Sequence, residues 1–274
     1  MANKSKDKTK EKIKEKNKAP IKMILLAIGV VLVFGTIMYF SFRYISHLNL
    51  RHETSSEAGP VPDQTDDLKG VDQDFSTDMY EIPDYSSLVS IGEYKGLSYE
   101  FDTFESDTYS SVKDQAVDHL LGQVIEKTTF KGYSQKEFDD AYAVADNNVN
   151  VFAEAYGMTK EEYLKSNFGF ETNEDYEKYM KNTTIKYLKV KMVVVQIAKA
   201  ENMTITDEDI AASKAKMMKD YGIETEEDFK KLYTDSDLQF YTIRDKVYDW
   251  LYENSTVINN STATDATTQD AESD

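Results

Sequence analysis

The sequence predicts a mostly α-helical protein: a single N-terminal transmembrane helix, then an extracytoplasmic multi-helix domain preceded by a short strand. Three observations support this fold class. Residues 23–42 carry no charged side chain, and a helix of that length crosses roughly 30 Å, about one hydrocarbon core. No proline follows Pro83, and the chain from there is dense in Glu, Lys, Tyr and Ala, a composition typical of helices. Apolar residues in this stretch recur at three- and four-residue steps.

Composition excludes several classes of function. The chain has 274 residues, 50 acidic and 32 basic side chains, three histidines and no cysteine. Without cysteine it has no disulfide framework, thiol nucleophile or cysteine-ligated zinc, and the net charge of −18 argues against a nucleic-acid binder. It has no glycine-rich phosphate loop, HExxH or G-x-S-x-G motif. We therefore expect no catalytic residue, no metal site and no cofactor, and a binding protein is the default.

The N-terminal segment is expected to anchor the protein in the cell membrane. Residues 1–22 form a basic head, and the span runs from Met23 to Phe42. A cleaved signal peptide would have a shorter apolar region that ends in a small-x-small site, and no such site follows Phe42. Because lysines concentrate before the span, the positive-inside rule places the N-terminus in the cytoplasm and the acidic body outside.

Two acidic segments are expected to be disordered. Residues 43–87 hold three of the four prolines and, from Glu53 on, ten acidic side chains against one lysine. A segment of this kind buries too little apolar surface to offset its ordering entropy, so we expect an extended tether. The chain becomes rich in Ser, Thr, Asn and Ala from Ser255 on, and residues 258–274 are expected to form a disordered acidic tail.

The folded part is expected to lie between these segments. Residues 88–104 have strand-type composition with glycine breaks and predict a short strand segment. Residues 105–257 are expected to form the helical domain, with long helices over 107–127, 134–156, 172–202, 206–221 and 236–253. The apolar run at 192–197 alone is also compatible with a buried strand, but it lies in a long stretch without proline or glycine, which favours a helix.

A short motif recurs where helices are expected to meet. Gly157, Gly169 and Gly222 each follow an aromatic residue and precede an apolar one, a pattern that ends a helix with a left-handed glycine. A threonine then follows each glycine, with an acidic residue three positions later, which predicts a capping box at the next helix. These pairs are Thr159–Glu162, Thr172–Asp175 and Thr225–Asp228, and Thr206–Asp209 is a fourth of the same type.

Several segments, taken in order, resemble trigger factor, the bacterial folding chaperone. Residues 91–97 resemble the strand that opens its isomerase domain. Residues 191–210 resemble the long helix and junction of its C-terminal chaperone domain, and residues 228–233 and 243–254 resemble that domain's final helices. The similar region covers roughly residues 106–257. The resemblance implies the helical, chaperone-type fold that is shared with the SurA and PrsA group of extracytoplasmic foldases.

The resemblance also shows where this chain departs from that family. Trigger factor carries a ribosome-docking domain at its N-terminus, where this chain has the expected anchor and tether. Its FKBP-type isomerase domain would follow the strand that ends at Leu97, but about ten residues separate that strand from the first expected helix. The resemblance therefore implies a client-holding helical module that lacks both domains.

The function implied by the resemblance is that of a membrane-anchored chaperone, which binds unfolded or newly exported polypeptides without ATP. Methionine suits such a surface because its side chain is flexible and polarizable. Methionines and tyrosines cluster at two of the glycine corners, where helix ends emerge. The candidate client-binding residues are Tyr156, Met158, Tyr163, Met217, Met218 and Tyr221. For each of them, the alternative is that the side chain fills the core between helices.

Two other functions remain open from the sequence. One is a peptidyl-prolyl isomerase of the trigger factor or PrsA type, against which the missing domain counts. The other is a structural or signalling ectodomain with one dedicated protein partner. General binding of unfolded proteins by the ectodomain distinguishes the chaperone from this last function.

The expected topology gives the first testable prediction. Protease added to intact protoplasts should remove the acidic body and leave a small membrane-bound stub, because the lysine-rich head holds the N-terminus inside. An immunoblot against an N-terminal tag measures this. Survival of the body until the membrane is lysed would show that the orientation is wrong.

Overall fold

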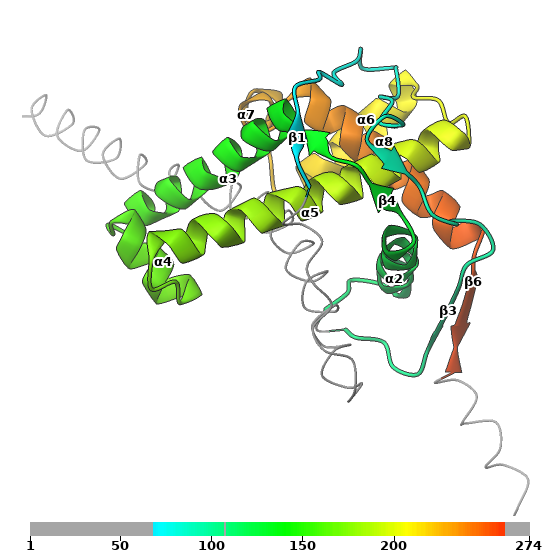
Figure 1. Ribbon diagram of the computed structural model, residues 1–274, viewed down its shortest axis with the longest axis horizontal. Helices are drawn as coiled ribbons and strands as arrows, with labels where there is room; N and C mark the ends of the chain where they lie inside the picture. Colours follow the sequence, from blue (N-terminus) through cyan, green and yellow to red (C-terminus); the bar gives the residue numbers. More distant parts are fainter. Residues whose placement is uncertain (1–67, 107, 261–274) are drawn as a thin grey trace, which may run out of the picture.

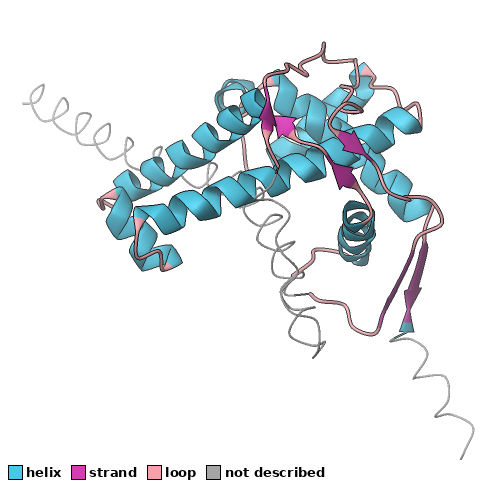
Figure 2. Cartoon of the chain, in the orientation of Figure 1, coloured by secondary structure: helices cyan, strands magenta, loops and turns pink. Residues whose placement is uncertain are grey.

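The computed structural model describes residues 68–106 and 108–260. The expected basic head, the membrane span, the first part of the tether and most of the acidic tail lie outside these residues. Within them, no helix is both long and apolar enough to cross a membrane. Helices make up most of this part of the chain, and the strands are short (Figure 2). The mostly helical fold class is therefore confirmed for the described residues.

The described elements are helices joined by tight corners, with three two-stranded sheets. The helices are α2 (Val112–Glu126), α3 (Gln135–Ala155), α4 (Lys160–Phe168), α5 (Asn173–Ala200), α6 (Asp207–Asp220), α7 (Glu226–Leu232) and α8 (Asp235–Glu253). The strands are β1 (Gly70–Val71) parallel to β5 (Tyr133–Ser134), β2 (Val89–Ser90) antiparallel to β4 (Thr129–Phe130), and β3 (Ser98–Phe101) parallel to β6 (Thr256–Asn259). The strand segment expected at 88–104 holds β2 and β3, which belong to different sheets.

The long helices lie close to the ranges that apolar periodicity predicts. Helices α3, α5, α6 and α8 agree within a few residues, and the apolar run at 192–197 lies inside α5 as expected. The first helix begins at Val112, later than predicted, because Ser111 takes extended backbone angles and its side chain accepts a hydrogen bond from the Asp114 N–H. A serine N-cap of this kind starts a helix by satisfying one of its free N–H groups.

The glycine corners are also confirmed. Gly157, Gly169 and Gly222 have φ angles of 67°, 74° and 63°, which is the left-handed region that glycine adopts without strain. Complete capping boxes form at Thr159 and Thr206.

The two remaining predicted boxes form only in part. Thr172 and Thr225 cap their helices as expected, but Asp175 and Asp228 accept a hydrogen bond from the threonine hydroxyl, at 2.7 Å in both cases. A complete box that the sequence analysis did not name starts α8 at Thr234.

The main core surrounds the C-terminal half of α5. Val193, Val194, Val195, Ile197 and Ala198 are all fully buried there, so this part of the helix is covered on every side. Helices α2 and α8 supply the facing apolar residues, and the β2 and β5 segments close the cluster. The N-terminal half of α5 leaves this core and runs beside α3, with α4 across their far ends (Figure 1). We call this projecting unit of α3, α4 and the first half of α5 the arm.

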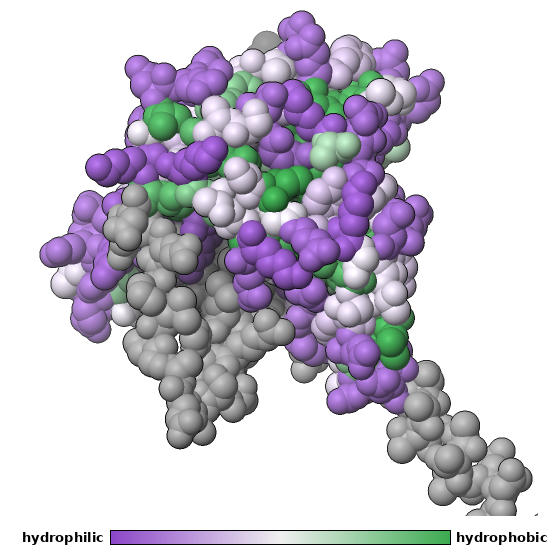
Figure 3. Space-filling model, turned by 45° about the vertical axis from the view of Figure 1, so that its right-hand side comes forward, coloured by the Kyte–Doolittle hydropathy of each residue, from purple (hydrophilic) through white to green (hydrophobic). Residues whose placement is uncertain are grey.

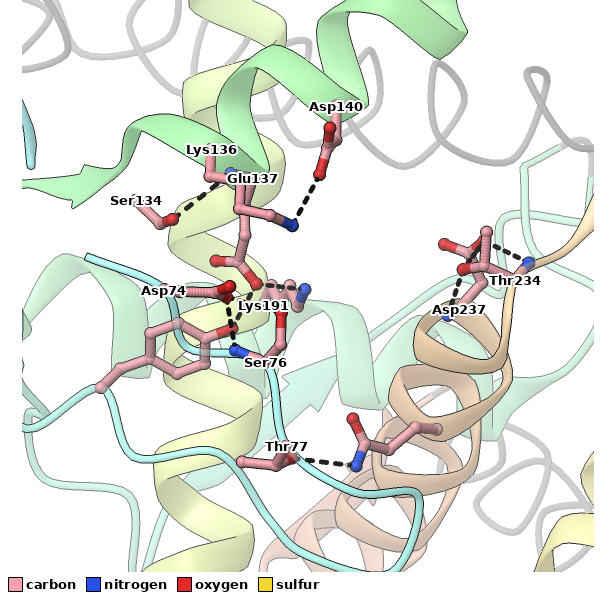
Figure 4. Close-up of polar contacts among 12 residues, drawn as sticks. Asp74, Ser76, Thr77, Ser134, Lys136, Glu137, Asp140, Lys191, Thr234 and Asp237 are labelled. Carbon is pink, nitrogen blue, oxygen red and sulfur yellow. Dashed lines mark hydrogen bonds and ion pairs between the residues drawn. The ribbon is translucent and has the colours of Figure 1, made fainter. Parts of the chain in front are cut away.

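Residues 68–87 differ from the expected disordered tether. Phe75 and Tyr85 are buried in the main core, with ring centroids 4.8 Å apart. The Tyr85 hydroxyl donates to Glu137 Oε1 at 2.7 Å, and Lys191 Nζ lies 2.7 Å from the same oxygen (Figure 4). Composition missed this order because a few well-separated apolar side chains insert between helices, while the acidic residues between them stay in solvent.

The chain also remains ordered past the expected end of the domain. Residues 256–259, partly assigned to the disordered tail, form β6 and pair in register with β3, from Ser98 with Thr256 to Phe101 with Asn259. Val257 packs against the main core, whereas Ile258 stays exposed. Alternation of this kind is typical of a half-buried strand, and its partner lies far away in the sequence.

Tyr85, the buried tyrosine of residues 68–87, gives a stability prediction with a matched control. Tyr85→Ala should lower the free energy of unfolding by about 3–5 kcal/mol, because it empties a fully buried aromatic site. Tyr80→Ala, five residues away and 55% exposed, should lower it by less than about 1 kcal/mol. Urea unfolding followed by circular dichroism measures both. Equal small effects would mean that the segment does not pack on the core.

Candidate functional site

The arm has an apolar cluster of its own, separate from the main core. It contains Ala145, Val149, Phe152, Ala153, Tyr163, Leu164, Tyr176 and Met180. Further along α5, the residues that belong to the main core begin at Ile185. Between the two clusters lie Thr183 and Thr184, which are buried but polar. The buried residues of the arm cluster therefore all come from α3, α4 and α5, and Leu232 at the end of α7 packs against them from the body.

Three large apolar side chains are exposed at this far end. Tyr156, Met158 and Phe168 are 66%, 38% and 44% exposed, and we call them the tip patch. Tyr163 lies between them, since its ring centroid is 5.8 Å from that of Tyr156 and 5.8 Å from that of Phe168. The Ser166 hydroxyl lies 3.8 Å from the Met158 sulfur, which places Met158 beside α4, the helix that carries Tyr163. The patch is therefore one continuous surface over Tyr163.

The glycine corners place these side chains in the open. Tyr156 is the last residue before Gly157, and the Met158 N–H then donates to the Ala153 carbonyl at 2.8 Å, which closes the end of α3. Phe168 is the last residue of α4, before Gly169. A Cβ atom on either glycine would meet no atom within 4 Å. Both glycines thus have open space at the Cβ position, and Tyr156, Met158 and Phe168 beside them are exposed.

A polar cluster ties the three arm helices together beneath the tip patch. Asp146 on α3 forms an ion pair with Lys160 on α4 and accepts a hydrogen bond from the Tyr176 hydroxyl on α5 at 2.9 Å. The Lys160 Nζ also lies 4.9 Å from the centroid of the Tyr176 ring. Burial and the nearby Asp146 carboxylate raise the pKa of Tyr176, so its hydroxyl stays a proton donor at neutral pH. These contacts fix the direction in which α4 presents its apolar residues.

The tip patch is bordered by acidic side chains. Glu154, Glu161 and Glu174 lie at the arm's far end, are exposed, and form no ion pair within the described part of the chain. Hydrophilic residues cover most of the protein face in Figure 3, with small apolar areas between them. Charges around a small apolar patch keep the free protein soluble.

The structure divides the six residues proposed from the sequence into two groups. Tyr156 and Met158 are exposed in the tip patch, whereas Tyr163 is buried beneath it with 8% exposure. Burial raises the pKa of Tyr163 as well. The arm therefore unites the first three candidates, but one of them is a core residue.

The other three candidates lie in a separate cluster on the body. Met217 is buried, and Met218 and Tyr221 pack half-buried against it. This α6–α8 cluster is made of Met217, Ile223, Phe229, Tyr233, Leu238 and Tyr241. Figure 1 places α4 and α6 at opposite ends of the molecule. The six candidate residues therefore do not form one continuous surface.

Sequence reasoning missed Phe168 as a site residue. The signal was present, because Phe168 precedes Gly169 just as Tyr156 precedes Gly157. Within residues 68–106 and 108–260, no group of three or more His, Asp or Glu side chains is placed to hold a metal ion. The arrangement at the arm end is suited to apolar contact and carries no evident reactive group.

Comparison with known proteins covers the arm and most of the body. Residues 103–253 match the family model described as bacterial trigger factor protein C-terminus. The chain is 25% identical over 164 residues to the trigger factor of Caldicellulosiruptor saccharolyticus, covering 56% of this chain and 35% of that protein. It is 25% identical over 204 residues to the trigger factor of Clostridium tetani, covering 70% and 47%. The chain thus spans about a third to a half of the length of these relatives.

Two neighbouring tyrosines of the arm should behave differently. Tyr163→Ala should destabilise the arm by roughly 3 kcal/mol, since it removes a buried ring from a small cluster. Tyr156→Ala, at 66% exposure, should change stability by less than about 0.5 kcal/mol. Hydrogen exchange of the α3 and α4 amides measures the local effect. Equal protection in both variants would contradict the assignment of Tyr163 to the arm core.

Proposed function

The chain belongs to the family of the bacterial trigger factor C-terminus, since the matched residues make up more than half of it, and we propose that it is a chaperone that binds non-native polypeptides without ATP. The observation that carries the proposal is the tip patch, an uncovered apolar surface on the end of a helical arm. Exposed apolar patches bounded by polar residues are typical of interaction sites.

The chemistry of the tip patch fits many partners better than one. Tyrosine and phenylalanine offer flat apolar rings, and the flexible Met158 side chain adapts to different surfaces. Each side chain contributes on the order of 1–3 kcal/mol when a client buries it. Three such contacts give weak and reversible binding, which suits a protein that must release its clients.

We further propose that the protein works at the outer face of the cell membrane. Residues 23–42 would anchor it, and the acidic segment that follows would hold the arm away from the lipid surface. The support is the uncharged run and the lysine excess before it. Its clients there would be newly exported polypeptides, which emerge unfolded at the same membrane.

The tip patch can be tested with a matched pair of variants. The wild-type protein should slow the aggregation of an unrelated unfolding protein at low molar excess, as measured by light scattering. Tyr156→Ser/Phe168→Ser should lose most of this protection, because it removes the two most exposed rings of the patch. Val144→Ser/Ile258→Ser should keep it, since these side chains are 53% and 39% exposed but lie outside the patch.

Each outcome decides a different point. If the tip variant keeps its helical circular dichroism and still protects, the patch is not the client site. If the wild type protects none of several unrelated clients, the dedicated-partner function gains and the chaperone proposal fails.

A further inference from the structure

Residues 76–81 form an exposed segment that is held at both ends. We call this segment the strap. Phe75 before it and Tyr85 after it are buried in the main core, while the strap crosses the body toward α6 and α8 (Figure 1). Its backbone-to-backbone hydrogen bonding is local, from the Glu81 N–H to the Asp78 carbonyl at 2.9 Å. The strap is therefore held in place by side chains of the helices it crosses, because it does not itself belong to a sheet or a helix.

One buried side chain on α8 binds the strap mainly through its backbone. The Gln239 amide nitrogen lies 2.7 Å from the Asp78 carbonyl and 2.8 Å from the Glu81 carbonyl. It also lies 3.2 Å from the Thr77 hydroxyl (Figure 4). Gln239 is 5% exposed. Every polypeptide offers main-chain carbonyls, so this recognition depends little on the sequence of the bound segment.

Two strap side chains complete the contact. Met79 packs against the α6–α8 cluster. The Tyr80 hydroxyl donates to Asp207 Oδ1 at the start of α6. The strap is thus bound as a peptide ligand would be. Its backbone carbonyls accept hydrogen bonds from the Gln239 amide, Met79 packs on an apolar cluster, and the Tyr80 hydroxyl donates to a carboxylate.

Two hydroxyl groups near the helices that the strap crosses are buried without a hydrogen-bond partner in the described residues. They are the Ser213 hydroxyl on α6 and the Tyr233 hydroxyl between α7 and α8. Buried polar groups are usually satisfied, and leaving one unpaired is unfavourable. Tyr233 belongs to the α6–α8 cluster, on which Met79 of the strap packs.

We propose that Gln239, Asp207 and the α6–α8 cluster form a second polypeptide-binding site, which the strap occupies in cis. This inference rests on the proposed chaperone function. The ligand is an extended segment of a non-native polypeptide with a methionine or aromatic side chain in the position of Met79. Because both strap ends are pinned, the strap competes at the high effective concentration of a short tether. The site opens only to clients that displace it.

The test uses the full chain and a fluorescent peptide of residues 76–82 as the probe. Met79→Ser/Tyr80→Ser weakens the strap, so fluorescence anisotropy should show at least about tenfold tighter peptide binding than in the wild type. Adding Gln239→Ala to this variant should remove the gain. Val144→Ser/Ile258→Ser should bind as the wild type does. Equal binding by the wild type and the strap variant, or a gain that persists without Gln239, would overturn the proposal.

The outcome is separable from that of the tip patch. Tyr156→Ser/Phe168→Ser, placed in the strap-weakened background, should keep the gain in peptide binding, whatever its effect on aggregation. If this background loses the gain, the peptide was bound at the tip and the second site does not exist.

A second measurement keeps the Tyr80 and Gln239 contacts of the strap in place. The chain has no cysteine, so Met79→Cys gives a unique thiol whose maleimide labelling rate reports strap release. Excess unlabelled 76–82 peptide should raise that rate severalfold, because a ligand that binds the open state increases its population. A rate unchanged by the peptide would contradict displacement of the strap.

Discussion

The structure depends on the continuity of α5. This helix has 28 residues and is roughly 42 Å long at 1.5 Å per residue. Residues 192–198 in its C-terminal half are buried on every side in the main core, and its N-terminal half forms one side of the arm. Because a helix without proline or glycine is stiff over this length, the core determines where the arm points. The arm therefore presents Tyr156, Met158 and Phe168 to solvent in a direction that the core sets.

The two apolar surfaces of the protein differ in how they are protected. The tip patch stays open because its side chains sit at helix ends beside left-handed glycines, with carboxylates around them. The α6–α8 cluster is instead partly covered, because Met79 of the strap packs on it. A small open apolar surface is compatible with solubility, whereas a second one left open would add to the risk of aggregation. Covering the second surface with the protein's own chain lowers that risk.

Ionic contacts join the segment that follows the strap to the helices, and one of them is the Asp84 pair with Lys199 on α5 at 2.9 Å. Glu137 on α3 accepts from Tyr85 and from Lys191 on α5, each at 2.7 Å. Burial and the Glu137 charge raise the pKa of Tyr85, which keeps its hydroxyl protonated as the donor. Beyond this point the acidic residues of the strap face solvent. The segment is thus anchored by buried contacts where it enters the core, and it is exposed to solvent where it crosses α8.

Local sequence signals determined the helices, because each acts over a few residues. The glycine and threonine corners located the ends of α3, α4 and α6, and the stretch without glycine or proline made the apolar run of α5 helical. Composition could not assign Phe75, Tyr85 or β6 to the fold, since their partners lie far along the chain. The sequence also could not show which side chains are exposed. Tyr156 and Tyr163 belong to one motif, yet packing among α3, α4 and α5 buries only Tyr163. The strap is the clearest case, because the Tyr80 contact with Asp207 spans 127 residues. No local pattern encodes such a contact, and only the folded arrangement of α6 and α8 creates it.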